Sequence, residues 1–282
     1  MVTKSAPVWF ITGCSTGLGR ALSQRVLEHG HRVVVTARNA DQIRDIVAGY
    51  PDAALGLALD VNDASQVDAA LTQARKRFEH IDVLVNNAGY GYLAAVEEGE
   101  DQDVRDMFET NFFSLVALIR KVLPGMRDRQ SGHIVNISSV GGLLGAASSG
   151  YYNATKFALE GLTEALAQEV EPLGIRVTAI EPGPFRTDWA GRSLKQAKHP
   201  IAAYAETAGA RRSQIAARSG KQAGDPVRAA DAIIKIVESD TPPRNLVLGK
   251  DGLDRVRAKF SALMQSIDDW EDVTLSADYP DA

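Results

Sequence analysis

Cysteine is almost absent from this chain of 282 residues, in which Cys14 stands alone. A single cysteine excludes an intrachain disulfide framework and a cysteine-based metal cluster. Long apolar runs are absent too, since none approaches the ~20 residues of a membrane span. Residues 1–7 lack the basic start and the apolar stretch of a secretory signal peptide. We therefore expect a cytoplasmic protein that has no membrane partner.

An excess of positive charge is also missing. The chain has 31 Lys and Arg against 36 Asp and Glu, which gives a formal net charge of −5. A general nucleic-acid-binding protein needs a basic surface that displaces counterions, so we expect no nucleic-acid partner. We expect no metal, because the five histidines are too scattered for a ligand set. They are His29, His31, His80, His133 and His199.

The chain alternates short apolar runs with longer helical patterns. The runs are Val8–Ile11, Val33–Val35, Leu55–Leu59, Val83–Val85, Ile134–Ile137, Val177–Ile180 and Leu246–Leu248. The helical patterns are Leu18–Glu28, Ala64–Phe78, Val104–Val122, Tyr152–Val170, Val227–Val237 and Leu253–Met264. Pro124 is expected to end the third of these helices. Continuous apolar runs are typical of parallel strands buried on both faces. The pattern predicts an α/β protein built from βαβ units, with a parallel sheet and right-handed crossovers. No repeat or Gly-, Ser- or Pro-rich linker divides residues 1–282, so we expect one domain.

A glycine-rich segment, Thr12–Gly19, joins the first predicted strand to the first predicted helix. Glycines in such a turn allow the backbone to approach a pyrophosphate, which the helix N-terminus also attracts. The spacing Gly-x-x-x-Gly-x-Gly differs from the usual dinucleotide fingerprint, Gly-x-Gly-x-x-Gly. A turn that serves packing alone is the alternative.

The residues after the second strand bear on nucleotide choice. The chain has Thr36-Ala37-Arg38 there, with no carboxylate that would hold a ribose 2′-hydroxyl. Arg38 can bind a 2′-phosphate through its guanidinium fork, although a solvated surface arginine is the alternative. We favour NADP(H) over NAD(H).

A tyrosine and a lysine four residues apart, Tyr152 and Lys156, fall at the start of a predicted helix. Residues at this spacing lie on one helix face. A neighbouring ammonium stabilises a phenolate, so Lys156 is expected to lower the pKa of Tyr152 toward a range useful for acid–base catalysis. The pair alone is common and is more often a plain helix face.

Two further polar residues fit the same site. Ser139 follows the fifth apolar run, at the strand end where open α/β sheets bind ligands, and its hydroxyl can donate to a developing alkoxide. Asn111 lies within a predicted helix, where asparagine is an indifferent helix former. Asn111 is a candidate functional residue, and a solvent-facing position is the alternative.

In their order and spacing, these residues resemble the short-chain dehydrogenase/reductase family, and Ser139–Gly161 is similar to its 17β-hydroxysteroid dehydrogenase-like branch. The matching residues are Thr12–Gly19, Asp60, Asn86–Gly89, Asn111, Ser139, Tyr152, Lys156, Pro182-Gly183 and Thr187. The resemblance covers Val8 to about Thr187 and is weak beyond that point. It implies a Rossmann-type, doubly wound α/β fold, in which a sheet of seven parallel strands in the order 3-2-1-4-5-6-7 has helices on both faces.

The resemblance also implies roles for these residues. Tyr152 would be the acid/base, Ser139 would orient the carbonyl oxygen, and Lys156 would hold the nicotinamide ribose. Asn111 would position a water that links Lys156 to solvent. The implied cofactor-binding residues are Gly13, Ser15, Thr16, Gly17, Leu18, Gly19, Arg38, Asp60, Val61, Asn87, Ala88, Gly89, Tyr152, Lys156, Pro182, Gly183, Phe185 and Thr187.

The later part of the chain is expected to set substrate specificity. A substrate lid is expected at about 184–224 and a C-terminal extension at about 250–282, frayed from Thr274 onward. Residues 186–228 contain nine Lys and Arg against three acids. They could favour an anionic substrate, or they could be ordinary solvated helix faces. The residues expected to line the substrate pocket are Tyr90, Tyr92, Leu143, Leu144, Phe185, Trp189 and Tyr204. For Leu143 and Leu144, packing in the core is an equal alternative.

These features predict an NADP(H)-dependent oxidoreductase that interconverts a ketone or aldehyde and a secondary alcohol. The expected partner is a small, apolar carbonyl or alcohol substrate, and the resemblance implies a homodimer or homotetramer. One alternative is a 3-oxoacyl-thioester reductase of the same family, although the long segment after Leu248 is not typical of that branch. Another is a catalytically silent NADPH-sensing regulator, for which a tyrosine hydroxyl would have no use.

Overall fold

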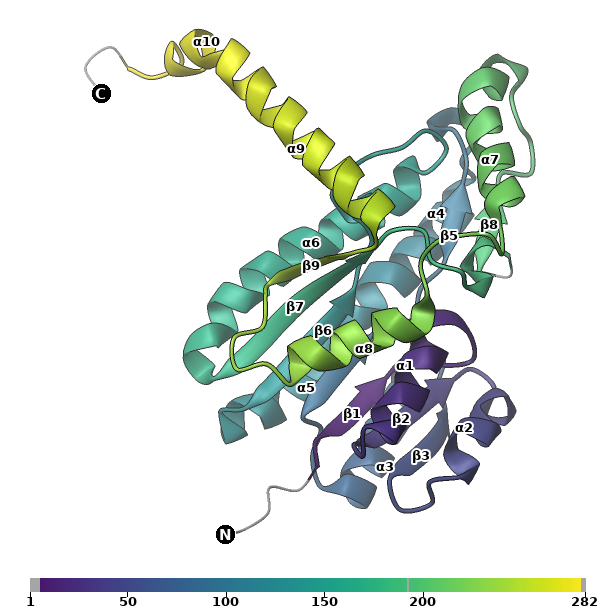
Figure 1. The fold of residues 1–282 in the computed structure, drawn as a ribbon, viewed down its shortest axis with the longest axis vertical. Coiled ribbons are helices and arrows are strands. Elements are labelled where there is room, and N and C mark those ends of the chain that lie inside the picture. The colour runs from purple at the N-terminus through teal and green to yellow at the C-terminus, as the bar shows by residue number, and fades with distance from the viewer. Residues whose placement is uncertain (1–5, 192, 280–282) are drawn as a thin grey trace.

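Seven parallel strands form one sheet, in the order β3-β2-β1-β4-β6-β7-β9 (Figure 1). The computed structural model describes residues 6–191 and 193–279, so predictions that involve residues 1–5, Arg192 and residues 280–282 lie outside the described residues. The strands are β1 Val8–Ile11, β2 Arg32–Ala37, β3 Ala54–Ala58, β4 Val83–Asn86, β6 Gly132–Ile137, β7 Ile175–Pro182 and β9 Asn245–Leu248. The predicted fold class and strand order are confirmed.

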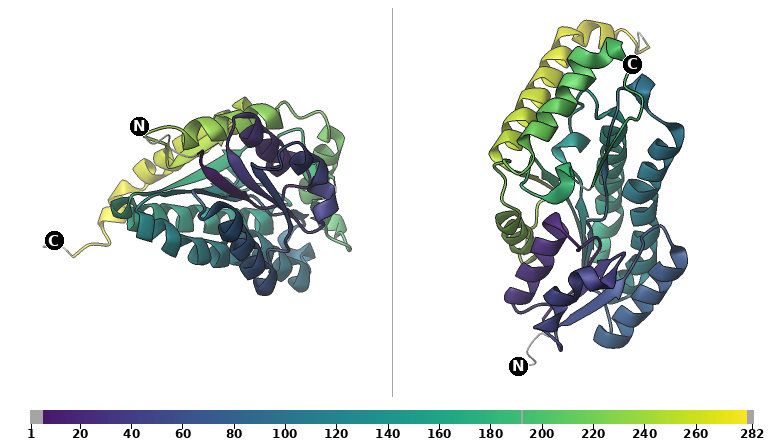
Figure 2. Two further views of the ribbon diagram at one scale, coloured as in Figure 1. Left: turned by 90° about the horizontal axis from the view of Figure 1, so that it is seen from below. Right: turned by 90° about the vertical axis from the view of Figure 1, so that its right-hand side faces the viewer.

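Helices cover both faces of this sheet (Figure 2). They are α1 Gly17–Glu28, α2 Arg44–Ala48, α3 Ala64–Phe78, α5 Ser114–Arg129, α6 Gly150–Val170 and α8 Pro226–Val237. One hydrophobic core lies beneath α3, α5 and α6, and it includes Val8 and Phe10 of β1. The other lies beneath α1, α2 and α8, and it includes Trp9 and Ile11. Successive side chains of a strand point to opposite faces, so the continuous apolar run of β1 supplies both cores.

The helix expected at Val104–Val122 is divided in the structure. Helix α4 (Asp101–Phe108) runs into a π-helical turn at Glu109–Phe113, and α5 follows at Ser114. The expectation that Pro124 ends this helix is wrong, because α5 continues to Arg129 with Pro124 inside it. A proline within a helix costs about 3 kcal/mol. Burial of the α5 face that carries Val122 and Met126 offsets that cost.

Two segments extend the structure above the carboxyl ends of the strands. A short ribbon of β5 (Gly91–Leu93) and β8 (Leu194–Gln196) leads to α7 (Ala210–Arg218). Helix α9 (Lys250–Asp269) projects away from the sheet, as Figure 1 shows, and exposes Phe260, Met264 and other apolar side chains. The chain remains helical in α10 (Glu271–Leu275), so the expected fraying from Thr274 is wrong for its first two residues. Among the described helices, none combines the length and the apolar character that crossing a membrane requires.

Candidate active site

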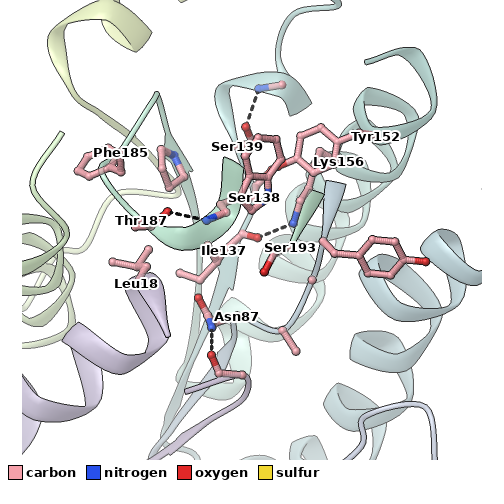
Figure 3. Close-up of a pocket in the computed structure, with 18 of the residues that line it drawn as sticks. Leu18, Asn87, Ile137, Ser138, Ser139, Tyr152, Lys156, Phe185, Thr187 and Ser193 are labelled. Atoms are coloured by element: carbon pink, nitrogen blue, oxygen red, sulfur yellow. Dashed lines mark hydrogen bonds between the residues drawn. The ribbon is translucent and has the colours of Figure 1, made fainter. Parts of the chain in front are cut away.

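A cavity of about 1250 Å³ lies at the carboxyl ends of the central strands. It is larger than a typical small-molecule pocket of roughly 300–1000 Å³, so it has room for a cofactor and a substrate together. Figure 3 shows part of its wall. Eighteen of the twenty predicted site residues line it: Gly13, Ser15, Thr16, Gly17, Leu18, Arg38, Asp60, Val61, Asn87, Ala88, Gly89, Ser139, Tyr152, Lys156, Pro182, Gly183, Phe185 and Thr187. Gly19 and Asn111 lie behind the wall, where each contacts a residue that lines it.

The glycine-rich loop is pinned to the loop after β4. Asn87 donates from its Nδ2 to the carbonyl oxygens of Thr12 (2.8 Å) and Gly13 (3.0 Å). Gly13 and Gly17 have φ of +71° and +61°, values that favour glycine. A Cβ on Gly19 would lie 2.3 Å from the Asn87 amide nitrogen and 2.5 Å from the Gly13 oxygen. The three glycines are therefore needed to bring this loop and the N-terminus of α1 to the cavity.

Ser139, Tyr152 and Lys156 converge on the cavity from two elements (Figure 3). Ser139 follows β6, and its Oγ accepts a hydrogen bond from the Gly141 amide at 2.9 Å. Tyr152 and Lys156 lie on α6, with the Lys156 Nζ 5.9 Å from the centre of the Tyr152 ring. The Lys156 ammonium donates to the Ile137 carbonyl at 2.8 Å. The tyrosine hydroxyl and the serine hydroxyl thus share one end of the cavity, and the lysine lies beneath them.

The ionisation of this pair differs from the sequence expectation. Burial raises the pKa of Tyr152 to about 12, while the hydrogen bond with Ser139 lowers it. Burial also lowers the pKa of Lys156 to about 8, and the charge of Glu160 opposes that shift. The expected lowering of the Tyr152 pKa by Lys156 is not found, because burial of the phenol sets the direction of the shift and the opposing contribution comes from Ser139. Tyr152 is consequently a protonated hydroxyl at neutral pH, suited to donate a proton.

Asn111 lies in the π-helical turn before α5 and is 1% exposed, so it is not solvent-facing. Its Oδ1 accepts from the Tyr90 amide at 3.0 Å, and its Nδ2 donates to the Tyr90 carbonyl at 2.8 Å. Nδ2 also lies 3.3 Å from the Thr155 hydroxyl on α6. The side chain therefore fixes the backbone beside Gly89 to the helix that carries Tyr152 and Lys156.

Two acids near Lys156, the half-buried Glu160 and the buried Glu181, were not predicted from the sequence. Glu160 lies one helical turn after Lys156, and Glu181 near the end of β7 is fully buried. Asn245 Nδ2 donates to Glu181 Oε1 at 2.7 Å and lies 3.4 Å from Glu160 Oε2. Burial, with the charge of Glu160, raises the pKa of Glu181 to about 7. The four-residue spacing from Lys156 was the one sequence signal that could have indicated Glu160.

We expect Glu181→Gln to stabilise the protein above neutral pH. Because the folded-state pKa is raised, the ionised carboxylate destabilises the fold as pH rises from about 4.5 to about 7. Glutamine keeps the oxygen that accepts from Asn245 and removes the charge. The free energy of unfolding in urea should exceed that of the wild type by about 2–3 kcal/mol at pH 8 and match it near pH 4.5. The exposed Glu171→Gln is the control, and an equal gain at both pH values would contradict the expectation.

The end of the cavity beside α7 and α9, called the lid end below, holds residues that the sequence could not place. Arg211 and Arg218 of α7 line it, as do Asp251 and Arg255 of α9. The lining also includes four of the seven expected wall residues: Tyr90, Leu144, Phe185 and Trp189.

The other three expected wall residues lie elsewhere. Leu143 packs against Val140 and Val256, Tyr92 of β5 is buried in a cluster with Met107, and the Tyr204 hydroxyl donates to Glu97. Their aromatic or apolar character did not distinguish packing from pocket lining.

Comparison with known proteins identifies relatives along the whole chain. The family described as short chain dehydrogenase matches residues 7–198. Oxidoreductase BOA17 of Botryotinia fuckeliana is 36% identical over 271 residues, which cover 96% of this chain and 98% of that protein. The crystal structure of a short-chain dehydrogenase from Streptomyces avermitilis superposes with a TM-score of 0.92 at 40% identity, covering 98% of this chain and 100% of that one.

Two more distant relatives of known structure contain cofactors. The 3-ketoacyl-(acyl-carrier-protein) reductase from Brucella melitensis is complexed with NADH, and it has a TM-score of 0.72. A metagenomic short-chain oxidoreductase is complexed with NADP, with a TM-score of 0.68. Both are 25% identical to this chain and cover 86% of it, and the match covers 97% of each of them. On these matches the chain belongs to the short-chain dehydrogenase/reductase family, and it is an oxidoreductase acting on CH–OH donors.

Proposed function

We propose that this protein is an NADP(H)-dependent oxidoreductase that interconverts a ketone or aldehyde and a secondary alcohol. The observation that carries the proposal is the meeting of a protonated tyrosine hydroxyl, Tyr152, with Ser139 and Lys156 in the same cavity as the glycine-rich loop. A nicotinamide cofactor is bound by solved relatives of this chain, in one case as NADH and in another as NADP.

The residues present fit such a cofactor. The Thr16 side chain makes no capping hydrogen bond at the start of α1, which leaves the first amides of that helix for an anionic pyrophosphate. Asp60 and Val61 would contact the adenine, and Asn87 with Gly89 would form the floor beneath the nicotinamide. Lys156 would hold the nicotinamide ribose. Pro182, Gly183, Phe185 and Thr187 would flank the nicotinamide.

The chain's own residues handle the proton. When bound, the nicotinamide cofactor supplies the hydride for reduction or accepts it in oxidation. In reduction, the Tyr152 hydroxyl donates its proton to the carbonyl oxygen, and in oxidation the phenolate takes the proton from the alcohol. Ser139 orients that oxygen by a hydrogen bond. The Lys156 ammonium, held beneath the ring by Ile137, offsets the negative charge that Tyr152 carries after donation.

An assay of NADPH absorbance with a panel of neutral ketones tests this function. We expect turnover of at least one apolar aryl or alkyl ketone. A protein that binds NADPH and reduces no member of the panel would instead be the regulatory alternative, which the complete set of Asn111, Ser139, Tyr152 and Lys156 disfavours. The apolar walls Leu144, Phe185 and Trp189 support an apolar substrate body, which is also our reason for retaining the 17β-hydroxysteroid dehydrogenase-like branch.

Arg38 supports the preference for NADP(H). It follows β2, is exposed and lines the cavity. With Arg38→Asp we expect the ratio of kcat/KM for NADPH to that for NADH to fall about 10- to 100-fold, because the guanidinium is lost and a carboxylate repels the 2′-phosphate. The control is Arg44→Asp, at an exposed residue of α2 that pairs with Asp41. An unchanged ratio in Arg38→Asp would overturn the cofactor preference.

A further inference from the structure

Three arginines come together at the lid end of the cavity. Arg211 and Arg218 project from α7 and Arg255 from α9, and all three line the cavity wall. Figures 1 and 2 show both helices rising from the same end of the sheet. Burial lowers the pKa of Arg211, and the charges of Arg255 and Arg218 lower it further, so each of these two cations lies near Arg211. Asp251, 3.7 Å from Arg255, is the acid that faces them, which leaves three positive charges against one negative.

Three other basic residues of the lid are paired with acids. Lys195 bonds to Asp103 at 3.0 Å, Lys198 bonds to Glu100 at 2.7 Å, and Arg212 forms an ion pair with buried Glu98. The Nε of Arg211 differs, because it is buried and has no hydrogen-bond partner among the described residues.

Native proteins rarely leave a buried donor such as this Nε unsatisfied. An oxyanion would satisfy the Arg211 guanidinium and reduce the repulsion among the three arginines.

The position of this cluster assigns it to the substrate and not to the cofactor phosphates. Val256, the residue after Arg255, packs against Val140 and Leu144 in the segment that follows Ser139. A Cβ on Gly252 would lie 2.8 Å from the Val140 side chain, which places the start of α9 against the same segment. The glycine-rich loop contacts a different part of the wall, since a Cβ on Gly17 would face Thr187 at 3.5 Å. A molecule whose carbonyl lies at Ser139 and Tyr152 can therefore extend toward the arginines along the apolar wall.

We propose that Arg211, supported by Arg218 and Arg255, binds an oxyanion on the substrate, so that the preferred substrates are carbonyl compounds with an apolar body and a terminal carboxylate or phosphate monoester. The proposal rests on the proposed function, because it names the substrate class of that same site. A planar guanidinium binds either oxyanion through two parallel hydrogen bonds.

The experiment compares aryl ketones that differ in the end of one alkyl chain. Phenyl ketones with two to six methylenes end in a carboxylate, a phosphate monoester or a methyl ester, and kcat/KM is measured with saturating NADPH at low ionic strength. We expect kcat/KM for the better oxyanion substrate to exceed that for the matched ester by about 10- to 100-fold at the optimal chain length. This is the factor that a hydrogen bond to a charged group contributes. The oxyanion with the higher kcat/KM shows whether the site prefers a carboxylate or a phosphate substrate.

Three variants locate the effect. Arg211→Gln should lower kcat/KM for the oxyanion substrate by about 10-fold or more and leave the methyl ester within about 2-fold. Arg211→Lys should restore part of the loss, because it keeps the charge and not the fork. Arg228→Gln, at an exposed residue of α8, is the matched control and should change neither.

A direct binding measurement separates this inference from the proposed function. Calorimetric titration of 4-phenylbutyrate and of phenylbutyl phosphate into the NADPH-bound protein reports the subsite without turnover. Binding that Arg211→Gln abolishes supports the subsite even if no ketone is reduced, in which case the proposed function alone fails. Three results would overturn the proposal. The first is an equal kcat/KM for esters and oxyanions at every chain length, and the second is an equal loss of kcat/KM for both in Arg211→Gln. The third is that neither anion binds.

Discussion

Replacement of Tyr152 by Phe is expected to lower kcat for ketone reduction by about 10²- to 10⁴-fold, the range that a positioned general acid contributes. The change removes one oxygen atom. It leaves the ring that packs against Trp189, with ring centres 5.4 Å apart, and it leaves Lys156 with its Ile137 carbonyl. Because the phenol has a pKa of about 12, it is almost wholly protonated at neutral pH, and its loss removes the proton donor itself.

The measurement is single-turnover reduction of the best ketone, together with NADPH binding by fluorescence. The Kd for NADPH should stay within a few-fold of the wild type, and thermal unfolding should be unchanged or slightly higher. Tyr151→Phe is a matched control one position away, since its hydroxyl donates to the Val96 carbonyl outside the cavity. Wild-type turnover in Tyr152→Phe would remove Tyr152 from the mechanism.

The sheet and most of the cofactor side of the cavity could be predicted because they depend on local patterns. Continuous apolar runs such as Val8–Ile11 are buried on both faces whatever the rest of the chain does, and strand–helix repetition then leaves one handedness of connection. The glycines of Thr12–Gly19 are required by close backbone approach and by positive φ, and these constraints act within one loop.

The errors arose where tertiary packing decided the outcome. Pro124 is tolerated inside α5, where it is exposed, because the opposite helix face that carries Val122 and Met126 is buried. The raised pKa of Tyr152 depends on how much protein surrounds the phenol, a property of the assembled site and not of the spacing to Lys156.

The substrate end of the site was the least predictable. Arg211 and Arg255 are 44 positions apart in the chain, and nothing in either local segment indicates that α7 and α9 meet the same cavity. The basic character of the lid was visible in composition. The basic residues divide into ones paired with acids of distant segments, such as Lys195 with Asp103, and Arg211, whose Nε has no hydrogen-bond partner among the residues that the structure describes.

Lys156→Met is expected to lower the activity of the enzyme and to raise its stability. Loss of the ammonium beneath Tyr152 should lower kcat/KM for ketone reduction by about 10²-fold or more, because the phenolate formed by proton donation loses its compensating charge. The pKa of Lys156 is lowered to about 8, so at pH 7 the folded protein holds a buried charge that costs free energy. Methionine fills a similar space without that charge, and the free energy of unfolding at pH 7 should rise by about 1–3 kcal/mol.

The pH dependence of the wild type gives the complementary evidence. A folded-state pKa of about 8 means that the ammonium is present below pH 8 and is lost above it, well before a free lysine would deprotonate. The kcat/KM for reduction should therefore decline above about pH 8 in the wild type. In Lys156→Arg the guanidinium stays charged, so whatever activity remains should lack that decline. A lysine that served packing alone would show neither the alkaline decline nor its loss in the arginine variant, and Lys156→Met would then lower stability without a specific effect on the proton-transfer step.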